Sequence, residues 1–206
     1  MNRKSIDKLL TSIGLVLSIF FFAAAGLLQW GHSFAANTVT TQLQAQNIFF
    51  PEAGSEGFTA EEFPDLQQWG GQQVTTGEQA RGYADEYIWV HMKGAAKAVT
   101  GKEATYSEVS GTYMKMSKDP AADQAEVAKY AGLRQTLFMG NTLRGLLLYG
   151  YAFATIGTIA GIAAVAAYAG GVLLLILGAT GLWHARRMRR ESSAATPTLK
   201  IGRAHV

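Results

Sequence analysis

The chain contains no cysteine, which excludes disulfide bonds, a thiol nucleophile and a cysteine-ligated metal. Histidine is scarce as well, with four in 206 residues. His32 and His184 flank apolar runs and His205 lies near the end of the chain, so His91 is the one histidine of the polar middle. A zinc or iron site needs several ligands at suitable spacing, so we predict no metal site and no cofactor.

Motifs for nucleotide binding and hydrolysis are also missing. The sequence has no G-x-x-x-x-G-K-[ST] loop, no G-x-G-x-x-G after a strand and no G-x-S-x-G elbow. Asp85 and Glu86 are adjacent and would point to different faces of a helix. Residues 31–145 hold 13 acidic and 9 basic side chains, a net charge of −4 without a basic stripe. We therefore predict no catalytic residues, no enzyme activity and no nucleic-acid partner.

Two long apolar runs are what the sequence does contain. The first, Leu9–Leu28, has 20 uncharged residues, about 30 Å as a helix and enough to cross a bilayer. Trp30 follows at the place of an interfacial aromatic residue. A cleaved signal peptide is the alternative, because Ser33-Phe34-Ala35 fits a cleavage rule, but its apolar core would be unusually long. We expect an uncleaved span at residues 9–30.

The second run has 39 uncharged residues between Arg144 and His184, about 58 Å as a helix. A hairpin turning at Tyr168–Gly171 would leave a second arm of 12 residues, Val172–Trp183, which is too short to cross. We therefore predict one span at residues 160–183 and an extension at residues 145–159 outside the membrane.

The extension should be part of a longer helix. We expect it to continue outward toward Pro120, with a bend or break at Gly140-Asn141. Val39 and Leu43 on the outward continuation of the first span are the expected packing partners of its apolar face, which comprises Leu146, Leu147, Tyr149 and Phe153.

Basic residues at the ends of both spans predict the orientation. By the positive-inside rule these ends face the cytoplasm. The topology-setting residues are Arg3, Lys4 and Lys8 before the first span and Arg186, Arg187, Arg189 and Arg190 after the second. The predicted parts are a cytoplasmic N-terminus (1–8), the first span (9–30), an extracytoplasmic helical domain (31–159), the second span (160–183) and a cytoplasmic basic tail (184–200).

Small residues recur in the second run at four-residue spacing, which lets helix backbones approach closely. The first span or a second copy of the chain is the expected partner. The candidate packing residues are Gly157, Gly161, Ala163, Ala167 and Gly171.

Helix signals dominate the middle of the chain. Three capping-box patterns, Thr59/Glu62, Thr75/Glu78 and Thr105/Glu108, predict helix starts, and Asp119-Pro120 predicts a fourth. We thus predict an all-α membrane protein, in which two transmembrane helices enclose a small extracytoplasmic helical bundle.

Aromatic residues in this middle region are weak candidates for the lining of a small ligand pocket, although core packing is the more ordinary use of such side chains. The candidates are Tyr83, Tyr87, His91, Tyr106 and Tyr113.

Three stretches resemble a family of uncharacterised two-span membrane proteins from actinobacteria: "QLQAQNIFFP", "TTGEQARGYADEYIWVHM" and "TLFMGNTLRGLLLYGYAFATIG". The resemblance covers about residues 1–190. Members are sometimes labelled aromatic ring-opening dioxygenases, but the stretches bring no catalytic residues with them. The resemblance implies location and architecture and leaves the activity open.

Two functions fit these observations. The first is a non-enzymatic scaffold or accessory protein of the plasma membrane, whose partners are the lipid bilayer and either a second copy or other envelope proteins. The alternative is a sensor with a four-helix ligand-binding input domain and a cytoplasmic output that is missing through truncation. Residues 201–206, IGRAHV, match what a common sequencing adapter would encode, and we expect them to be foreign to the protein.

Overall fold

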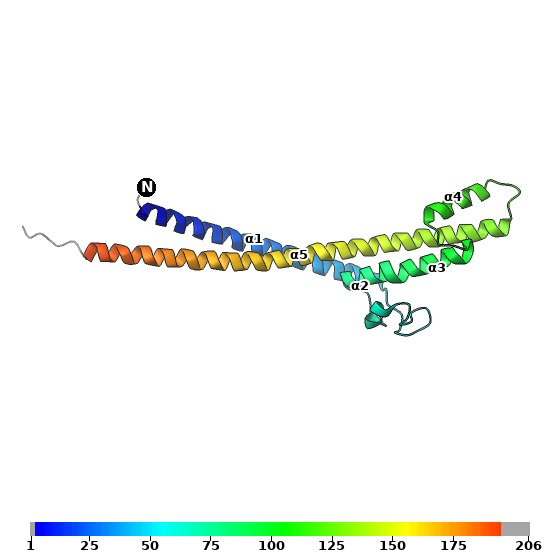
Figure 1. Cartoon of the computed structure of the whole chain (residues 1–206), viewed down its shortest axis with the longest axis horizontal. Helices are drawn as coiled ribbons and strands as arrows, with labels where there is room; N and C mark the ends of the chain where they lie inside the picture. The colour runs from blue at the N-terminus through cyan, green and yellow to red at the C-terminus, as the bar shows by residue number, and fades with distance from the viewer. Residues whose placement is uncertain (1–2, 195–206) are drawn as a thin grey trace, which may run out of the picture. The chain divides into compact units, whose positions relative to one another are not determined.

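Helices account for the whole regular structure of the computed structural model, which describes the backbone of residues 3–194 and the side chains of residues 6–188 and 190. Within these residues there is no β-strand, only an isolated antiparallel bridge between Phe49 and Gln73. The expected all-α class is confirmed (Figure 1). The elements are α1 (Arg3–Gln46), the 3₁₀ helix η1 (Pro64–Trp69), α2 (Gly77–Gly82), the π-helix η2 (Tyr83–Ile88), α3 (Trp89–Thr100), α4 (Tyr106–Met116) and α5 (Gln124–Ala194).

The chain forms two compact units. One, here called the paired-helix unit, consists of α1 up to Gly31 and α5 from Ile159. The other, here called the central unit, is His32–Thr158.

The paired-helix unit is an antiparallel pair. Thr11 of α1 lies at Gly181 of α5, and the Ser18 hydroxyl donates a 2.9 Å hydrogen bond to the Gly171 carbonyl. Because the residue numbers rise along one helix as they fall along the other, the two segments run in opposite directions.

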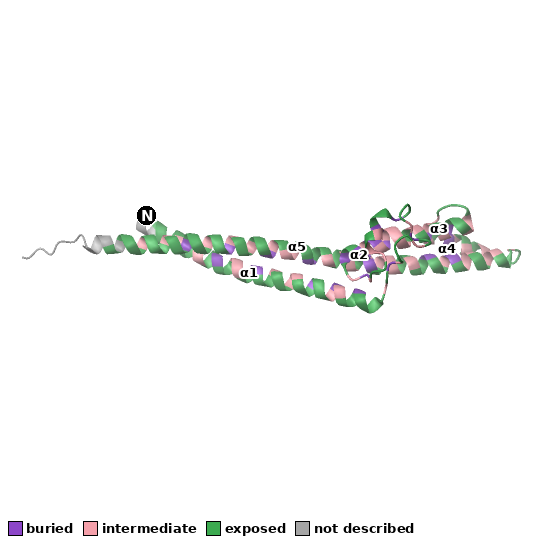
Figure 2. Cartoon of the chain, turned by 90° about the horizontal axis from the view of Figure 1, so that it is seen from below, coloured by how far each residue is buried: buried purple, intermediate pink, exposed green. Residues whose placement is uncertain are grey.

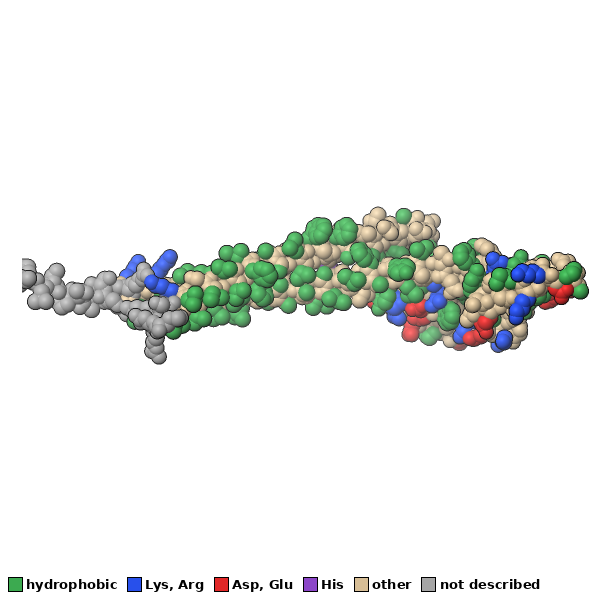
Figure 3. Space-filling view, turned by 90° about the horizontal axis from the view of Figure 1, so that it is seen from above, with side chains coloured by type: hydrophobic (Ala, Val, Ile, Leu, Met, Phe, Trp, Pro, Cys, Tyr) green, Lys and Arg blue, Asp and Glu red, His purple; other side chains and the backbone are tan. Residues whose placement is uncertain are grey.

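The two long helices are apolar and mostly exposed. The most apolar 18-residue windows of α1 and α5 have mean hydropathies of 2.2 and 2.3, yet only 11% of each window is buried. A core helix of a soluble protein would be mostly buried. Both helices are therefore long and apolar enough to cross a membrane, and Figure 3 shows hydrophobic side chains covering the drawn face of the paired-helix unit.

The central unit has two hydrophobic clusters, visible as buried segments in Figure 2. The first lies under the loop that joins α1 to α2. The Gln67 side chain stabilises this loop by hydrogen bonds to its backbone. Its Nε2 donates to the Phe58 carbonyl at 3.0 Å, and its Oε1 accepts from the Gly54 N–H at 2.9 Å. The buried members are Val39, Leu43, Phe50, Phe58, Phe63, Leu66, Val74, Ala80, Ala84 and Leu147.

The second cluster joins α3, α4 and the outer part of α5 through Met92, Ala96, Val109, Leu133 and Leu137. The helix α4 begins as the sequence predicts. The Thr105 hydroxyl accepts from the Glu108 N–H, and the Glu108 carboxylate accepts from the Thr105 N–H at 2.7 Å.

Two of the other predicted helix starts are wrong. The Thr59 hydroxyl does accept from the Glu62 N–H at 3.3 Å, but a turn follows it and the helical turn begins only at Pro64, whose fixed φ suits a first helical position. The second capping box is Thr76 with Gln79, not Thr75 with Glu78. Thr75 precedes the cap and donates its backbone N–H to the Gln79 side chain.

The start of α5 also differs from the prediction. Asp119 caps an isolated turn by accepting from the Ala121 N–H, and the helix starts after Asp123, which accepts from the Ala125 N–H at 2.9 Å. From Gln124 the helix continues through Gly140-Asn141, so the break considered there is absent. Gly140 serves packing instead, because a Cβ there would lie 2.5 Å from the Met92 sulfur. The continuous helix expected across residues 145–159 is confirmed.

Candidate functional site

Within the central unit, α1 and α5 approach each other closely at Gly157. A Cβ on this residue would lie 2.7 Å from the Ala35 Cβ and 3.6 Å from the His32 carbonyl oxygen. His32 adds a bond, because its Nδ1 lies 2.8 Å from the Gly157 carbonyl oxygen and can donate to it. At Gly150 the separation is larger, with Leu43 Cδ2 3.9 Å from the position of a Cβ. The helices therefore part as they leave this contact.

An apolar groove of about 580 Å³ lies where they part. Leu43 and Leu147 are buried beside it, whereas Leu146 and Tyr149 are 63% and 76% exposed. None of its lining residues is charged. They are Thr38, Val39, Gln42, Leu43 and Gln46 from α1, and Leu143, Leu146, Leu147, Tyr149, Gly150, Ala152, Phe153 and Ile156 from α5.

The packing of residues 145–159 against α1 differs in part from the expectation. Leu147, 2% exposed, joins Val39 and Leu43 in the first cluster as predicted. Leu146 and Tyr149, by contrast, are largely exposed along the groove, so the expectation that they pack against α1 is wrong. An apolar pattern marks the face of a helix that avoids water, but it does not tell whether protein covers that face.

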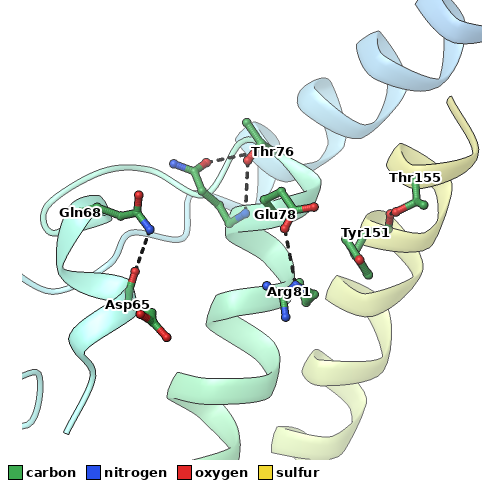
Figure 4. Close-up of polar contacts among 8 residues, drawn as sticks. Asp65, Gln68, Thr76, Glu78, Arg81, Tyr151 and Thr155 are labelled. Carbon is green, nitrogen blue, oxygen red and sulfur yellow. Dashed lines mark hydrogen bonds and ion pairs between the residues drawn. The ribbon is translucent and has the colours of Figure 1, made fainter. Parts of the chain in front are cut away.

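A smaller pocket of about 280 Å³ lies beside the start of α2, with His32, Thr76, Glu78 and Thr155 among its lining residues. Figure 4 shows Thr76 capping α2, Glu78 paired with Arg81, and Tyr151 on the neighbouring turn of α5. The Arg81 guanidinium stands 5.7 Å from the centre of the Tyr151 ring. The lining mixes hydroxyl groups, an imidazole and a carboxylate, so this pocket is more polar than the apolar groove.

Arg144 of α5 contacts the π-helix η2 and the start of α3. Arg144 Nε donates to the Ala84 carbonyl at 2.9 Å, and its NH2 group lies 2.8 Å from the Asp85 carboxylate. The guanidinium also stands over the Trp89 ring at 4.4 Å. Sequence reasoning did not find this group, although an arginine at the edge of a 39-residue uncharged run was a signal for it.

The five aromatic pocket candidates belong to two separate clusters. Tyr83, Tyr87 and His91 follow one another along η2 and α3, and the Tyr87 and His91 rings lie 4.3 Å apart. His91 is exposed, stacks on Phe63 at 5.9 Å and places its Nδ1 2.8 Å from the Tyr87 carbonyl oxygen. Burial raises the pKa of the Tyr83 hydroxyl, and the nearby Tyr87 raises it further.

The other two candidates lie on α4 beside Arg134. A hydrogen bond from Arg134 lowers the pKa of Tyr106, and the Arg134 guanidinium stands 4.9 Å from the Tyr113 ring centre. Tyr106 also contacts Phe138 at 6.0 Å. These two aromatic residues therefore face α5 and do not share a site with His91.

The candidate packing glycines and alanines differ in burial. Gly157 and Gly171 are buried, and the Cβ position of Gly171 lies 3.3 Å from the Phe22 ring. Gly161, Ala163 and Ala167 are half-buried. Two further small residues, Ala164 and Gly178, are buried although the sequence analysis did not single them out. The buried positions recur every seven residues, which is the period of two helices that wind around each other.

The cations that are expected to set the topology are only partly described. Lys8, Arg186, Arg187 and Arg190 are exposed. The side chains of Arg3, Lys4 and Arg189 lie outside the described ones, as does the expectation for residues 201–206. Lys8 also lines a groove of about 890 Å³ in the paired-helix unit, together with Asp7, Thr11 and His184.

Among the described residues, no three histidine or acidic side chains are grouped so that they could hold a metal ion. Comparisons of the chain with family models, with curated proteins and with solved structures found no significant match in any of the three. The proposals below therefore depend on the geometry of the chain.

Proposed function

We propose that the chain is a non-enzymatic accessory protein of the cell-envelope membrane, with spans at residues 9–30 and 160–183. The observation that supports it most is the exposure of apolar side chains on both long helices. Phe20, Ile162 and Val165 are 65%, 67% and 68% exposed. Apolar surface in contact with water costs about 25 cal/mol per Å², so two helices covered in such surface favour a lipid environment.

The proposed orientation places the central unit outside the cytoplasm. Lys8 precedes the first span, and the exposed Arg186, Arg187 and Arg190 follow the second. Basic residues at span ends are retained on the cytoplasmic side. The central unit between the spans has the opposite charge balance, with 13 acidic against 9 basic residues at positions 31–145.

The proposed role is contact with other envelope proteins or with a second copy of the chain. Large apolar side chains are exposed around the second cluster of the central unit: Met114 is 51%, Phe138 52% and Met139 55% exposed. Exposed large apolar side chains on this unit favour a protein–protein contact there.

A photocrosslinking amino acid placed at Met114 in living cells tests this role. We expect discrete protein adducts there, and an adduct of twice the mass of the chain would identify a second copy. The matched control is the same amino acid at Ile19, which is 70% exposed on the first proposed span and should give lipid adducts only. If Met114, Phe138 and Met139 all fail to give protein adducts, the interaction role is wrong.

A further inference from the structure

We infer that the apolar groove of the central unit binds one acyl chain of a membrane lipid, with the carboxyl end of that chain toward Gln46. This inference depends on the proposed function, because it requires that α1 and α5 cross the bilayer.

The lining selects for hydrocarbon. Buried leucines form the floor of the groove, with Leu43 from α1 and Leu147 from α5. Among the thirteen lining residues there is neither a lysine or arginine for an anionic ligand nor a carboxylate for a cationic one. The volume of about 580 Å³ lies within the range of sites for small molecules, which is about 300–1,000 Å³.

The length of the groove fits a single chain. On α5 the lining extends from Leu143 to Ile156, which is about 20 Å at 1.5 Å per residue. One leaflet of a bilayer contributes about 15 Å of hydrocarbon, half of the core thickness. A single chain of that length therefore fills about three quarters of the groove.

On α5 the groove ends a few residues before the segment that is proposed to cross the membrane. Ile156 is the last lining residue on α5, and Ile159, three residues later, begins the paired-helix unit. This continuity of apolar surface along one helix favours lipid over a soluble apolar ligand.

Polarity along the groove orients the chain. Phe153 and Ile156 line the end nearest to Ile159, whereas the side-chain amides of Gln42 and Gln46 lie toward the opposite end. Amide N–H groups are hydrogen-bond donors to the ester oxygens at the carboxyl end of an acyl chain. The methyl end then lies against the phenylalanine and the isoleucine.

Two photoreactive lipids test both occupancy and orientation. The full chain is placed in nanodiscs with a phosphatidylethanolamine whose palmitoyl chain bears a diazirine, near the methyl end in one lipid and near the carboxyl end in the other. We expect the first to label peptides that contain Phe153 or Ile156. The second should label peptides that contain Gln46 or Leu143.

A matched pair of substitutions provides the control. Gly150 lines the groove, so the side chain of Gly150→Leu would occupy part of it. Gly145 does not line the groove, and a Cβ at this position has no atom within 4 Å. We expect Gly150→Leu to reduce labelling roughly tenfold, because excluding only two methylene groups of the chain lowers affinity by about that factor. Gly145→Leu should label as the parent does. Helical circular dichroism and gel filtration verify that both variants are folded.

Three results would overturn the inference: equal labelling of both variants, the same labelled peptides for both lipids, or crosslinks that place a second copy of the chain in the groove. Phe153→Ala, which shortens one wall, gives an independent reading if Gly150→Leu does not fold. The nanodisc experiment does not depend on which side of the membrane the central unit faces. A negative result for lipid binding in the groove can therefore be told apart from a wrong topology. Cysteine labelling in cells tests the topology separately.

Discussion

Arg144 joins three elements of the central unit through one side chain. Its guanidinium reaches the Ala84 carbonyl and the Asp85 carboxylate in η2 and covers the Trp89 ring in α3, although the residue itself belongs to α5. The side chain is 20% exposed, so water screens these contacts less than it screens an exposed ion pair. The same guanidinium makes the two hydrogen bonds and the ring contact, so replacing Arg144 should remove all three.

We predict that Arg144→Met destabilises the central unit by about 1.5–3 kcal/mol, the range for hydrogen bonds that involve a charged group. Thermal unfolding followed by circular dichroism in detergent measures the loss. Lys129→Met is the matched control. Its partner Glu126 is 2.8 Å away, but both side chains are exposed, so the change should be within about 1 kcal/mol. Equal effects of the two substitutions would show that the Arg144 contacts contribute no more than an exposed ion pair.

Tyr83 should make the stability of the fold depend on pH under alkaline conditions. Burial raises the pKa of its hydroxyl above the ordinary 10.0, and burial raises that of Tyr87 as well. A folded-state pKa above the unfolded one means that folding favours the neutral phenol. The stabilisation is therefore complete below pH 10 and is lost as the pH rises through the folded-state pKa.

We predict that the unfolding temperature of the parent falls above pH 10 and that Tyr83→Phe reduces this fall. Tyr113→Phe is the control, since it removes a phenol of α4 outside this cluster, and it should leave the slope unchanged. If the parent and Tyr83→Phe have the same slope above pH 10, Tyr83 is not the titrating group.

At the scale of the elements, the contact between α1 and α5 in the central unit depends on the absence of a side chain at Gly157. The Ala35 Cβ cannot rotate away from a new Cβ only 2.7 Å distant, so the two backbones must separate. Separation also lengthens the contact between His32 Nδ1 and the Gly157 carbonyl oxygen.

We predict that Gly157→Val costs about 1–3 kcal/mol, as overpacking of a close contact does, and speeds hydrogen exchange in residues 32–46. Gly145→Val places the same β-branched residue on the same helix with nothing within 4 Å of its Cβ, so it should leave that exchange unchanged. Faster exchange in both variants would assign the effect to helix propensity and not to the contact.

The sequence predicted the elements better than it predicted their contacts. Hydropathy and charge were sufficient for the two long apolar helices, because bilayer thickness and helix rise fix the required length. Capping patterns in the sequence correctly predicted the start of α4 at Thr105/Glu108. They misplaced the start of α5, because Asp119 and Asp123 are both suitable N-cap residues.

The candidate site was harder to predict. Leu146 and Leu147 are adjacent leucines of one helix, yet one is 63% and the other 2% exposed. The difference depends on how far α1 and α5 part beyond Gly157, a distance that no local pattern records. The same reason explains why the spacing of the small residues suggested a period of four, whereas the buried positions recur every seven.

For the chain as a whole, we propose that two helices cross the membrane and that the central unit between them lies outside the cytoplasm. The exposed apolar surface of the helices and the basic residues at their ends support the claim. The proposed contact role and the lipid groove both depend on the crossing itself, and the contact role depends on the orientation as well.

Cysteine labelling can test this topology, because the chain has no cysteine of its own. Glu103→Cys places a thiol in the central unit, and Ser192→Cys places one beyond the arginines that follow the second span. In intact cells an impermeant maleimide should label Glu103→Cys and not Ser192→Cys, and after permeabilisation it should label both. Labelling of Ser192→Cys alone in intact cells would contradict the orientation, and labelling of both would contradict the pair of crossings.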